Sequence, residues 1–275
     1  MKTLLLFLIV LIPILSSAQQ GDSWAKVKST GSGTLAVLYY EQPGLIFKHT
    51  DGTVKGVCAD ILSDFQKYIE ANYGKKVSIK YVGEETEFPR FLNSIQHTDN
   101  LLGVTNTSIT EERKKILKFT PPFMSNELVL LTNKNSPSIK DLSEIPVTFK
   151  GFTAQVISGS THVASIEKIK KQYYPELKVE TLPSSDAILK NLVANPKIFT
   201  VIDFTEYIGV IRQKTAIKKQ DVELGDPEQL GFIMSKQTDW DSVWKEFLTP
   251  EYRKSVRYKE IIANNLGSSF LTLVR

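Results

Sequence analysis

Residues 101–113, with the sequence LLGVTNTSITEER, contain the pattern that decides the fold of this chain. The first four residues form an apolar run of the length expected for a short buried strand. A polar segment follows and ends at Thr110, a residue type that often caps the start of a helix. The stretch therefore predicts a buried strand, a turn and a short helix, which is the repeating unit of an α/β domain.

Strands and helices alternate on both sides of this stretch. Upstream, the pattern predicts strands at residues 34–40 and 77–82, a hairpin turn at residues 51–52, and helices at residues 59–74 and 88–96, after a polar lead-in at residues 19–33. Downstream, it predicts strands at residues 127–132, 154–157, 179–182, 199–202, 222–224 and 231–234, and helices at residues 161–172, 185–193, 240–248 and 252–264. The alternation predicts two α/β lobes, each a mixed and mostly parallel sheet flanked by helices, with a ligand cleft between them.

The composition excludes several classes of protein. The 275 residues are 41% hydrophobic and 23% charged, which is ordinary for a globular protein and excludes a disordered or collagen-like chain. A net charge of +4 is too close to neutral to indicate nucleic acid as a partner. With Cys58 as its one cysteine, the chain can form no internal disulfide and no cysteine metal cluster. No phosphate-loop, Gly-x-Ser-x-Gly or His-Glu-x-x-His motif occurs, so we expect no metal and no cofactor.

The N-terminus has the features of a secretory signal peptide. Lys2 precedes an apolar run at residues 4–15, and Ser16 and Ala18 are the small residues expected at a cleavage site after Ala18. The run is shorter than the roughly 20 residues that a membrane-spanning helix needs, although an uncleaved anchor is the alternative. Cleavage removes residues 1–18 and predicts an exported protein, periplasmic or secreted.

Arg113 is the first candidate for ligand binding. It lies just inside the predicted helix that follows a buried strand, where free backbone N–H groups and a guanidinium can together hold a carboxylate. A solvated basic face is the alternative, and it is favoured for the neighbouring Lys114 and Lys115. The pattern alone leaves both explanations open for Arg113.

Two further candidates lie in the second half of the chain. Ser160 and Thr161 precede a predicted helix, where hydroxyl and N–H groups suit an anion, although ordinary helix capping explains them equally well. Asp203 ends an apolar strand, a position where open α/β sheets often place ligand groups, and it is also suited to cap the next helix. His162, next to Thr161, is expected at the surface, with a place at the edge of the cleft as the alternative.

Several short motifs occur together along the chain. The most specific is SITEER at residues 108–113 followed by FTPPF at residues 119–123. The supporting motifs are GVCADI at residues 56–61, GST at residues 159–161, VID at residues 201–203 and LGFI at residues 230–233. In these motifs the chain resembles, over about residues 33–267, the family 3 extracellular solute-binding proteins, which are the periplasmic amino-acid-binding components of ABC transporters.

The resemblance implies a fold and a division of the chain. The fold is the two-lobed type II periplasmic binding protein fold, with the ligand cleft between the lobes. Lobe 1 is expected to comprise residues 19–126 and 226–275, and lobe 2 residues 127–225. Hinge strands are expected near residues 127–131 and 222–225.

The resemblance also implies roles for individual residues. Arg113 on one lobe is expected to bind the α-carboxylate of the ligand, and Asp203 on the other to accept hydrogen bonds from its α-ammonium group. Opposite charges on the two lobes favour closure around a zwitterion. The other expected donors are Ser108 and the backbone at Asn106 on the first lobe, and Thr161 with Ser160 on the second.

The chain departs from the family at the expected side-chain pocket. Tyr39 and Tyr40 are candidates for an aromatic platform, but Gln42 stands where the family often has an aromatic residue. Val57 and Cys58 replace the usual Phe and acidic residue, which weakens the case for stacking and for a cationic ligand. Cys58 itself is expected to be a small buried side chain and not a nucleophile.

We therefore expect an exported, monomeric binding protein that is not an enzyme. It captures a small amino-acid-like ligand, zwitterionic or carboxylate, by closure of the two lobes and delivers it to an ABC transporter permease. Two alternatives share the fold: an exported dehydratase-like enzyme, with Asp203 or Glu41 as the acid or base, and a soluble sensor subunit that signals to a membrane partner.

Overall fold

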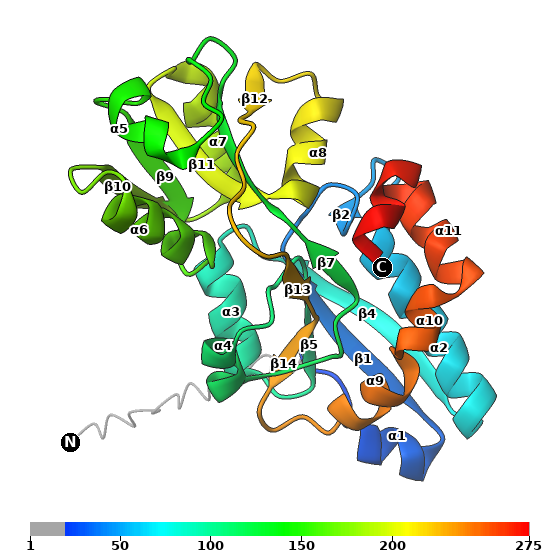
Figure 1. The fold of residues 1–275 in the computed structure, drawn as a ribbon. Helices are drawn as coiled ribbons and strands as arrows, with labels where there is room; N and C mark the ends of the chain where they lie inside the picture. The colour runs from blue at the N-terminus through cyan, green and yellow to red at the C-terminus, as the bar shows by residue number, and fades with distance from the viewer. Residues whose placement is uncertain (1–19, 275) are drawn as a thin grey trace, which may run out of the picture.

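Two five-stranded sheets carry the fold in the computed structural model, which describes residues 20–274 (Figure 1). The predicted signal peptide at residues 1–18 lies outside the described residues. In strand order, the first sheet is β4 (Lys76–Glu84), β1 (Ser32–Tyr39), β5 (Leu101–Val104), β14 (Ile233–Ser235) and β6 (Leu117–Phe119), and the second is β10 (Lys178–Leu182), β9 (Thr153–Ile157), β11 (Ile198–Asp203), β8 (Leu128–Asn133) and β12 (Ile217–Lys219). In the first sheet β4, β1 and β5 are parallel, and β14 is antiparallel to its neighbours. In the second sheet β10, β9 and β11 are parallel, and β8 is antiparallel to its neighbours. The prediction of two α/β lobes with mixed sheets is confirmed.

Helices flank both sheets (Figure 1). Around the first sheet lie α1 (Trp24–Thr30), α2 (Val57–Tyr73), α3 (Phe88–His97), α4 (Glu111–Ile116), α9 (Asp241–Phe247), α10 (Pro250–Lys254), α11 (Val256–Asn265), the 3₁₀ turn η3 (Ser268–Val274) and the hairpin of β2 (Phe47–Lys48) and β3 (Val54–Lys55). Around the second lie η2 (Leu142–Glu144), α5 (Ile145–Thr148), α6 (His162–Gln172), α7 (Ser185–Ala194) and α8 (Phe204–Arg212). Within residues 20–274, none of the helices has both the length and the apolar character needed to cross a bilayer.

Helix α2 illustrates how the sequence pattern produces the core. Its apolar residues recur at helical spacing, and Ile61, Leu62 and Phe65 are fully buried. The Phe65 ring stacks on Trp244 of α9 with 3.7 Å between ring centroids. Burial of one such side chain contributes about 1.5–3 kcal/mol. The helix ends where Gly74 adopts a left-handed conformation, with φ of 61°, as the sequence predicts.

Some elements differ from the prediction. Helix α1 occupies the predicted polar lead-in, because Trp24 and Val27 alone anchor it in the core and two residues leave no visible periodicity. Helix α8, directly after β11, is also unpredicted. Residues 222–224, predicted as a strand, belong instead to a segment that runs from one sheet to the other. The predicted C-terminal helix is divided at Ser255, whose hydroxyl caps α11.

The chain passes between the two sheets twice (Figure 1). It leaves β6, forms β7 (Met124–Asn126) and enters the second sheet as β8; it returns from β12 through β13 (Glu228–Leu230) to β14. β7 and β13 pair with each other as an antiparallel ribbon. Of the residues expected near the hinge, Glu127 and residues 222–225 lie on these crossings, whereas residues 128–131 lie within β8. The two crossings therefore run side by side next to the cleft.

Candidate functional site

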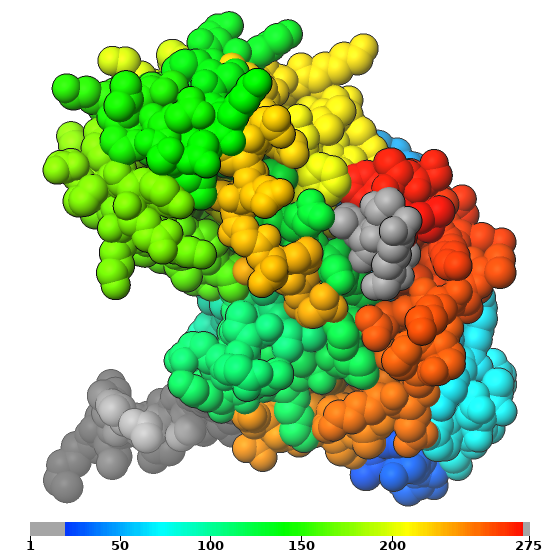
Figure 2. Space-filling view, viewed as in Figure 1, coloured from blue at the N-terminus to red at the C-terminus, as the bar shows by residue number. Residues whose placement is uncertain are grey.

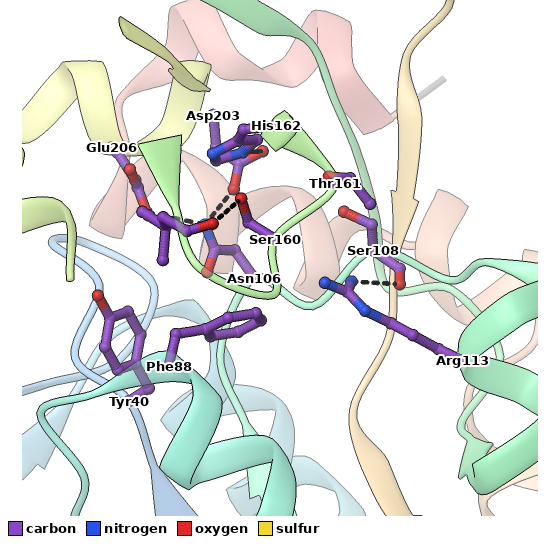
Figure 3. A pocket seen from close by; sticks show the side chains of 11 residues that line it. Tyr40, Phe88, Asn106, Ser108, Arg113, Ser160, Thr161, His162, Asp203 and Glu206 are labelled. Atoms are coloured by element: carbon purple, nitrogen blue, oxygen red, sulfur yellow. Dashed lines mark hydrogen bonds and ion pairs between the residues drawn. The ribbon is translucent and has the colours of Figure 1, made fainter. Parts of the chain in front are cut away.

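A small cavity lies between the lobes, where strand ends and helix starts from both sheets meet (Figure 3). Figure 2 shows a notch between the two lobes at one side of the molecule. Inside the cavity, only about 20 Å³ is accessible to the centre of a water-sized molecule. That volume holds one water molecule and is too small for an amino acid, so the lobes are closed on each other. The cavity is lined by Tyr40, Phe88, Asn106, Ser108, Arg113, Ile157, Ser160, Thr161, His162, Asp203 and Glu206.

Arg113 lies in the cavity wall because Thr110 starts helix α4 as the sequence predicts. The Thr110 hydroxyl accepts a hydrogen bond from the Arg113 backbone N–H at 3.1 Å. The buried guanidinium donates to the backbone oxygen of Ser108 and, across the cleft, to that of Gly159, both at 2.9 Å. It also lies 5.5 Å from the ring centre of Phe88. Burial lowers the pKa of Arg113, and the nearby carboxylates of Glu228 and Asp203 oppose that shift.

An internal carboxylate occupies the position between the two lobes where the sequence predicts carboxylate-binding hydroxyls. Glu228 of β13 accepts hydrogen bonds from the hydroxyl of Ser108 and, at 3.0 Å, from the hydroxyl of Thr161. Ser108 follows β5 of the first sheet, and Thr161 precedes α6 beside the second. The Ser160 hydroxyl, in contrast, donates to the backbone oxygen of Ile157 at 2.8 Å. The structure thus brings Ser108, Thr161 and a carboxylate together.

Asp203 lies at the end of β11 and at the start of α8, but its side chain makes no capping bond to that helix. Its buried carboxylate instead accepts hydrogen bonds from the side-chain amides of Asn106 and Asn126, the latter at 2.5 Å. The Nε2 atom of His162 lies 3.5 Å from Oδ1 of Asp203, the oxygen that also accepts from Asn126. The geometry therefore favours a role in the cleft for Asp203 over helix capping.

His162 is buried, with 3% of its surface exposed, which corrects the expectation of a surface residue. It occupies the first turn of α6, and the packing of that turn against the end of β11 encloses it. Burial alone would lower the pKa of His162, but the hydrogen bond to Asp203 and the charges of Asp203, Glu206 and Glu228 raise it overall. The carboxylates around His162 therefore favour its protonated form.

Glu206 is the second buried carboxyl group of the cavity. It is 4% exposed; its Oε1 accepts from the Asn106 amide at 3.3 Å, and its Oε2 has no hydrogen-bond partner. Burial and the charge of Asp203 raise the pKa of Glu206 to about 7, against the opposing effects of His162 and Asn106. The carboxyl group is therefore poised to change its charge near neutral pH.

Tyr40 reaches the cavity and Tyr39 does not. Consecutive strand residues point to opposite faces of a sheet, so only one of the two side chains can face the cleft. The Tyr40 ring packs edge-on against Phe88, with 5.7 Å between centroids, whereas Tyr39 packs against Tyr81 in the core of the first lobe. Tyr40 is the residue of this pair that can contact a ligand.

The sequence analysis does not single out Phe88, Glu206 or Glu228. Glu206 carries a recognisable signal, because it interrupts the apolar run after Asp203 and lies one helical turn beyond it. For Phe88, the only signal in the sequence is its place at the start of a predicted helix. Glu228 carries none, since its neighbours in sequence are polar and its partners lie far away along the chain.

Residues 57 and 58, where the sequence departs from the family, lie in the core and not in the cleft. Val57 and Cys58 are fully buried in the first turns of α2, and burial raises the pKa of the Cys58 thiol. A protonated, enclosed thiol is inert, so the prediction of a structural Cys58 is confirmed. Among residues 20–274, no group of three or more His, Cys, Asp or Glu side chains is arranged to hold a metal ion.

Comparisons with known proteins give consistent similarities. The model of the family "Bacterial extracellular solute-binding proteins, family 3" matches residues 35–268. The probable amino-acid-binding protein YxeM of Bacillus subtilis is 24% identical over 189 residues, which cover 67% of this chain and 68% of YxeM. Its name describes YxeM as an amino-acid binder.

Solved structures are similar at the level of the fold. An ancestral arginine-binding protein bound to glutamine is 23% identical, with a TM-score of 0.68 over 85% of this chain and 98% of that one. The amino acid ABC transporter substrate-binding protein AbpA of Streptococcus pneumoniae, bound to L-arginine, is 16% identical, with a TM-score of 0.66 over 90% of this chain and 99% of that one. At these identities the likeness establishes the two-lobed fold.

Proposed function

The chain belongs to the bacterial extracellular solute-binding proteins of family 3, and on that premise we propose that it captures an amino-acid-like ligand, zwitterionic or carboxylate, for an ABC transporter. The name of the Bacillus subtilis relative and the amino acids bound in the similar structures support this class of ligand. The family consists of binding proteins and not enzymes, so the dehydratase-like alternative is set aside.

The carboxylate of Glu228 is the observation that carries the proposal. It lies on hydroxyls from both sides of the cleft, and its charge acts on the Arg113 guanidinium. The same groups suit the α-carboxylate of a ligand, with Ser108 and Thr161 donating neutral hydrogen bonds and Arg113 a charge-assisted one. In the ligand complex, the α-carboxylate takes the place that the Glu228 side chain has here.

The α-ammonium group is assigned to Asp203. In the structure, the amides of Asn106 and Asn126 donate to this carboxylate, and the imidazole of His162 lies against it. A ligand ammonium forms a stronger, charge-assisted hydrogen bond than the Asn106 amide does, so it can replace that amide. Ser160, whose hydroxyl is bonded to the backbone, contributes to the shape of this wall.

Ligand entry requires the lobes to separate. Arg113 with Gly159, Asn106 with Asp203, and the Tyr40 hydroxyl with the backbone N–H of Ser185 are contacts that join the two sides of the cleft. We assign residues 19–126 and 226–275 to lobe 1 and residues 127–225 to lobe 2. Opening then breaks these contacts and rotates the lobes about the paired crossings β7 and β13.

The location and partner follow from the same proposal. Cleavage after Ala18 releases the mature chain into the periplasm or the medium, where it acts as a monomer. It delivers its ligand to the permease of an ABC transporter. The extracellular character of the family supports this location.

A thermal-shift screen of the mature chain against amino acids and small carboxylates tests the function. A ligand that binds only the native state raises the melting temperature, and we expect a hit among the amino acids. Arg113→Ala and Asp203→Ala should each abolish the shift, whereas Lys114→Ala, an exposed neighbour on α4, should retain it. No shift with any compound, or a shift unaffected by both cleft substitutions, would contradict the proposal.

A further inference from the structure

A second, larger cavity adjoins the cleft on the side away from Arg113. It has a volume of about 660 Å³ and is formed by both lobes: the loop after β1, the end of β4, and the sides of α7 and α8. Tyr40 and Glu206 line both cavities and form the wall between them. Figure 3 shows these two residues on one side of the cleft and Arg113 on the opposite side. A ligand held by its carboxylate at Arg113 therefore points its far end towards this side cavity.

The side cavity is strongly acidic. The carboxylates of Glu41, Glu84, Glu85, Asp186 and Glu206 line it, and Lys190 is the one basic residue in its wall as described. Lys190 pairs with Asp186 at 2.7 Å, whereas the four glutamates make no ion pair with any described basic residue. Burial and the charge of Glu84 raise the pKa of Glu41, a sign of carboxylates that crowd one another. Such a cavity attracts a cation and repels an anion.

Two buried polar side chains in this cavity lack partners. Oε2 of Glu206, a residue 4% exposed, makes no hydrogen bond, and neither does either side-chain polar atom of Gln42, which is 1% exposed. The Gln42 amide lies near the Glu206 carboxyl group and moderates its pKa, but it completes no hydrogen bond of ordinary geometry. Buried polar atoms without a hydrogen-bond partner destabilise the folded protein. Two of these atoms, Oε2 of Glu206 and Oε1 of Gln42, are oxygens that can accept hydrogen bonds from N–H donors.

We propose that the ligand carries a cationic side chain whose ammonium or guanidinium group enters the side cavity and binds Glu206 and Gln42. The aliphatic part of that side chain passes Tyr40, whose ring borders both cavities. The inference rests on the proposed function, because the carboxylate at Arg113 directs the side chain. The acidic group for a cationic ligand then lies on α8, at Glu206, and not at position 58, where this sequence has a cysteine.

Isothermal titration calorimetry with matched ligands tests the proposal on the mature chain. L-Arginine and L-citrulline have nearly the same shape, and only arginine is charged; L-lysine and L-norleucine form a second such pair. We expect each cation to bind at least about tenfold more tightly than its neutral counterpart. Glu206→Gln should remove most of this preference and retain binding of citrulline. Glu167→Gln, the same change at an exposed position on α6, should leave the preference intact.

The possible outcomes are distinguishable. Equal or tighter binding of the neutral ligands overturns the cationic subsite and leaves the amino-acid-binding function standing. Equal weakening of charged and neutral ligands by Glu206→Gln also overturns the subsite, because Glu206 then acts on the whole cleft. Failure of every amino acid to bind overturns the proposed function itself.

Discussion

The two ends of the cleft differ in how completely their polar groups are bonded. At one end, the Arg113 guanidinium and the Ser108 and Thr161 hydroxyls all have partners within the protein. At the other end, Glu206 Oε2, His162 Nδ1 and the Gln42 amide have none. A ligand must replace existing bonds at the first end, whereas it supplies missing bonds at the second. We therefore expect the Arg113 end to govern closure and the Glu206 end to provide most of the net gain in binding free energy.

Asp203 lies between the two ends, and its loss should have the largest effect. Asp203→Ala leaves the buried His162 imidazole and the Asn126 amide without their acceptor, so we expect the unliganded protein to lose about 3–5 kcal/mol of unfolding free energy. Urea denaturation measures this loss. Glu112→Ala breaks only an exposed pair with Lys115 and should change stability by less than about 1 kcal/mol. Similar losses of unfolding free energy in the two variants would show that the Asp203 carboxylate does not hold the buried groups of the cleft together.

Glu228 supplies the carboxylate that the Ser108 and Thr161 hydroxyls bind at the Arg113 end, so its substitution should weaken closure. Glu228→Gln removes the charge that a ligand carboxylate must displace, so we expect amino-acid binding to tighten about tenfold, or about 1.4 kcal/mol. Small-angle scattering should also show a larger radius of gyration for the unliganded variant than for the wild type. Weaker binding in Glu228→Gln would instead make Glu228 part of the ligand contact.

The Glu206 end should make stability depend on pH. The folded protein raises the pKa of Glu206 to about 7 and also raises that of His162, which faces Asp203 and Glu206. The stability that these protons add is complete below pH about 4.5. It is lost as the pH rises from there through about 7, because over this range the native state holds protons that the unfolded state has already released. We expect a loss of at least about 1 kcal/mol between pH 5 and 8.

Melting temperatures of the unliganded protein across this pH range provide the measurement. Glu206→Gln should flatten the decline, since the amide does not titrate. A wild-type melting temperature that stays constant or rises over this range would exclude the proposed ionisation.

Phe88 should show the smallest effect. Its ring lies against the buried Arg113 guanidinium, which keeps both of its hydrogen bonds in Phe88→Leu, so we expect this variant to bind ligand only roughly threefold more weakly. Phe91→Leu lies on the same helix but outside the cleft, so it should reduce stability and leave affinity unchanged. Equal loss of affinity in both variants would assign the effect to packing of α3.

The features that were predicted from sequence depend on local chemistry. Helical spacing in α2 and the capping hydroxyl of Thr110 act within a few residues, so the pattern reveals them directly. The placement of Arg113 follows from that cap. The family motifs add the expectation that Arg113 and Asp203 face the same cleft from opposite sides, which no local pattern contains.

The features that were missed depend on packing between distant segments. The burial of His162 depends on the end of β11, about 40 residues later, and the partners of Glu228 lie on both lobes. Strand alternation places Tyr39 and Tyr40 on opposite faces, but only the position of the second lobe decides which face is the cleft. Glu206 follows Asp203 by one helical turn and was the one missed residue with a sequence signal.

A crystal structure of the mature chain with a bound amino acid tests the central claim most directly. The account predicts that the ligand carboxylate lies on the Ser108 and Thr161 hydroxyls and on the Arg113 guanidinium, with the Glu228 side chain turned away. An amino acid bound elsewhere, with Glu228 still on both hydroxyls, would contradict it.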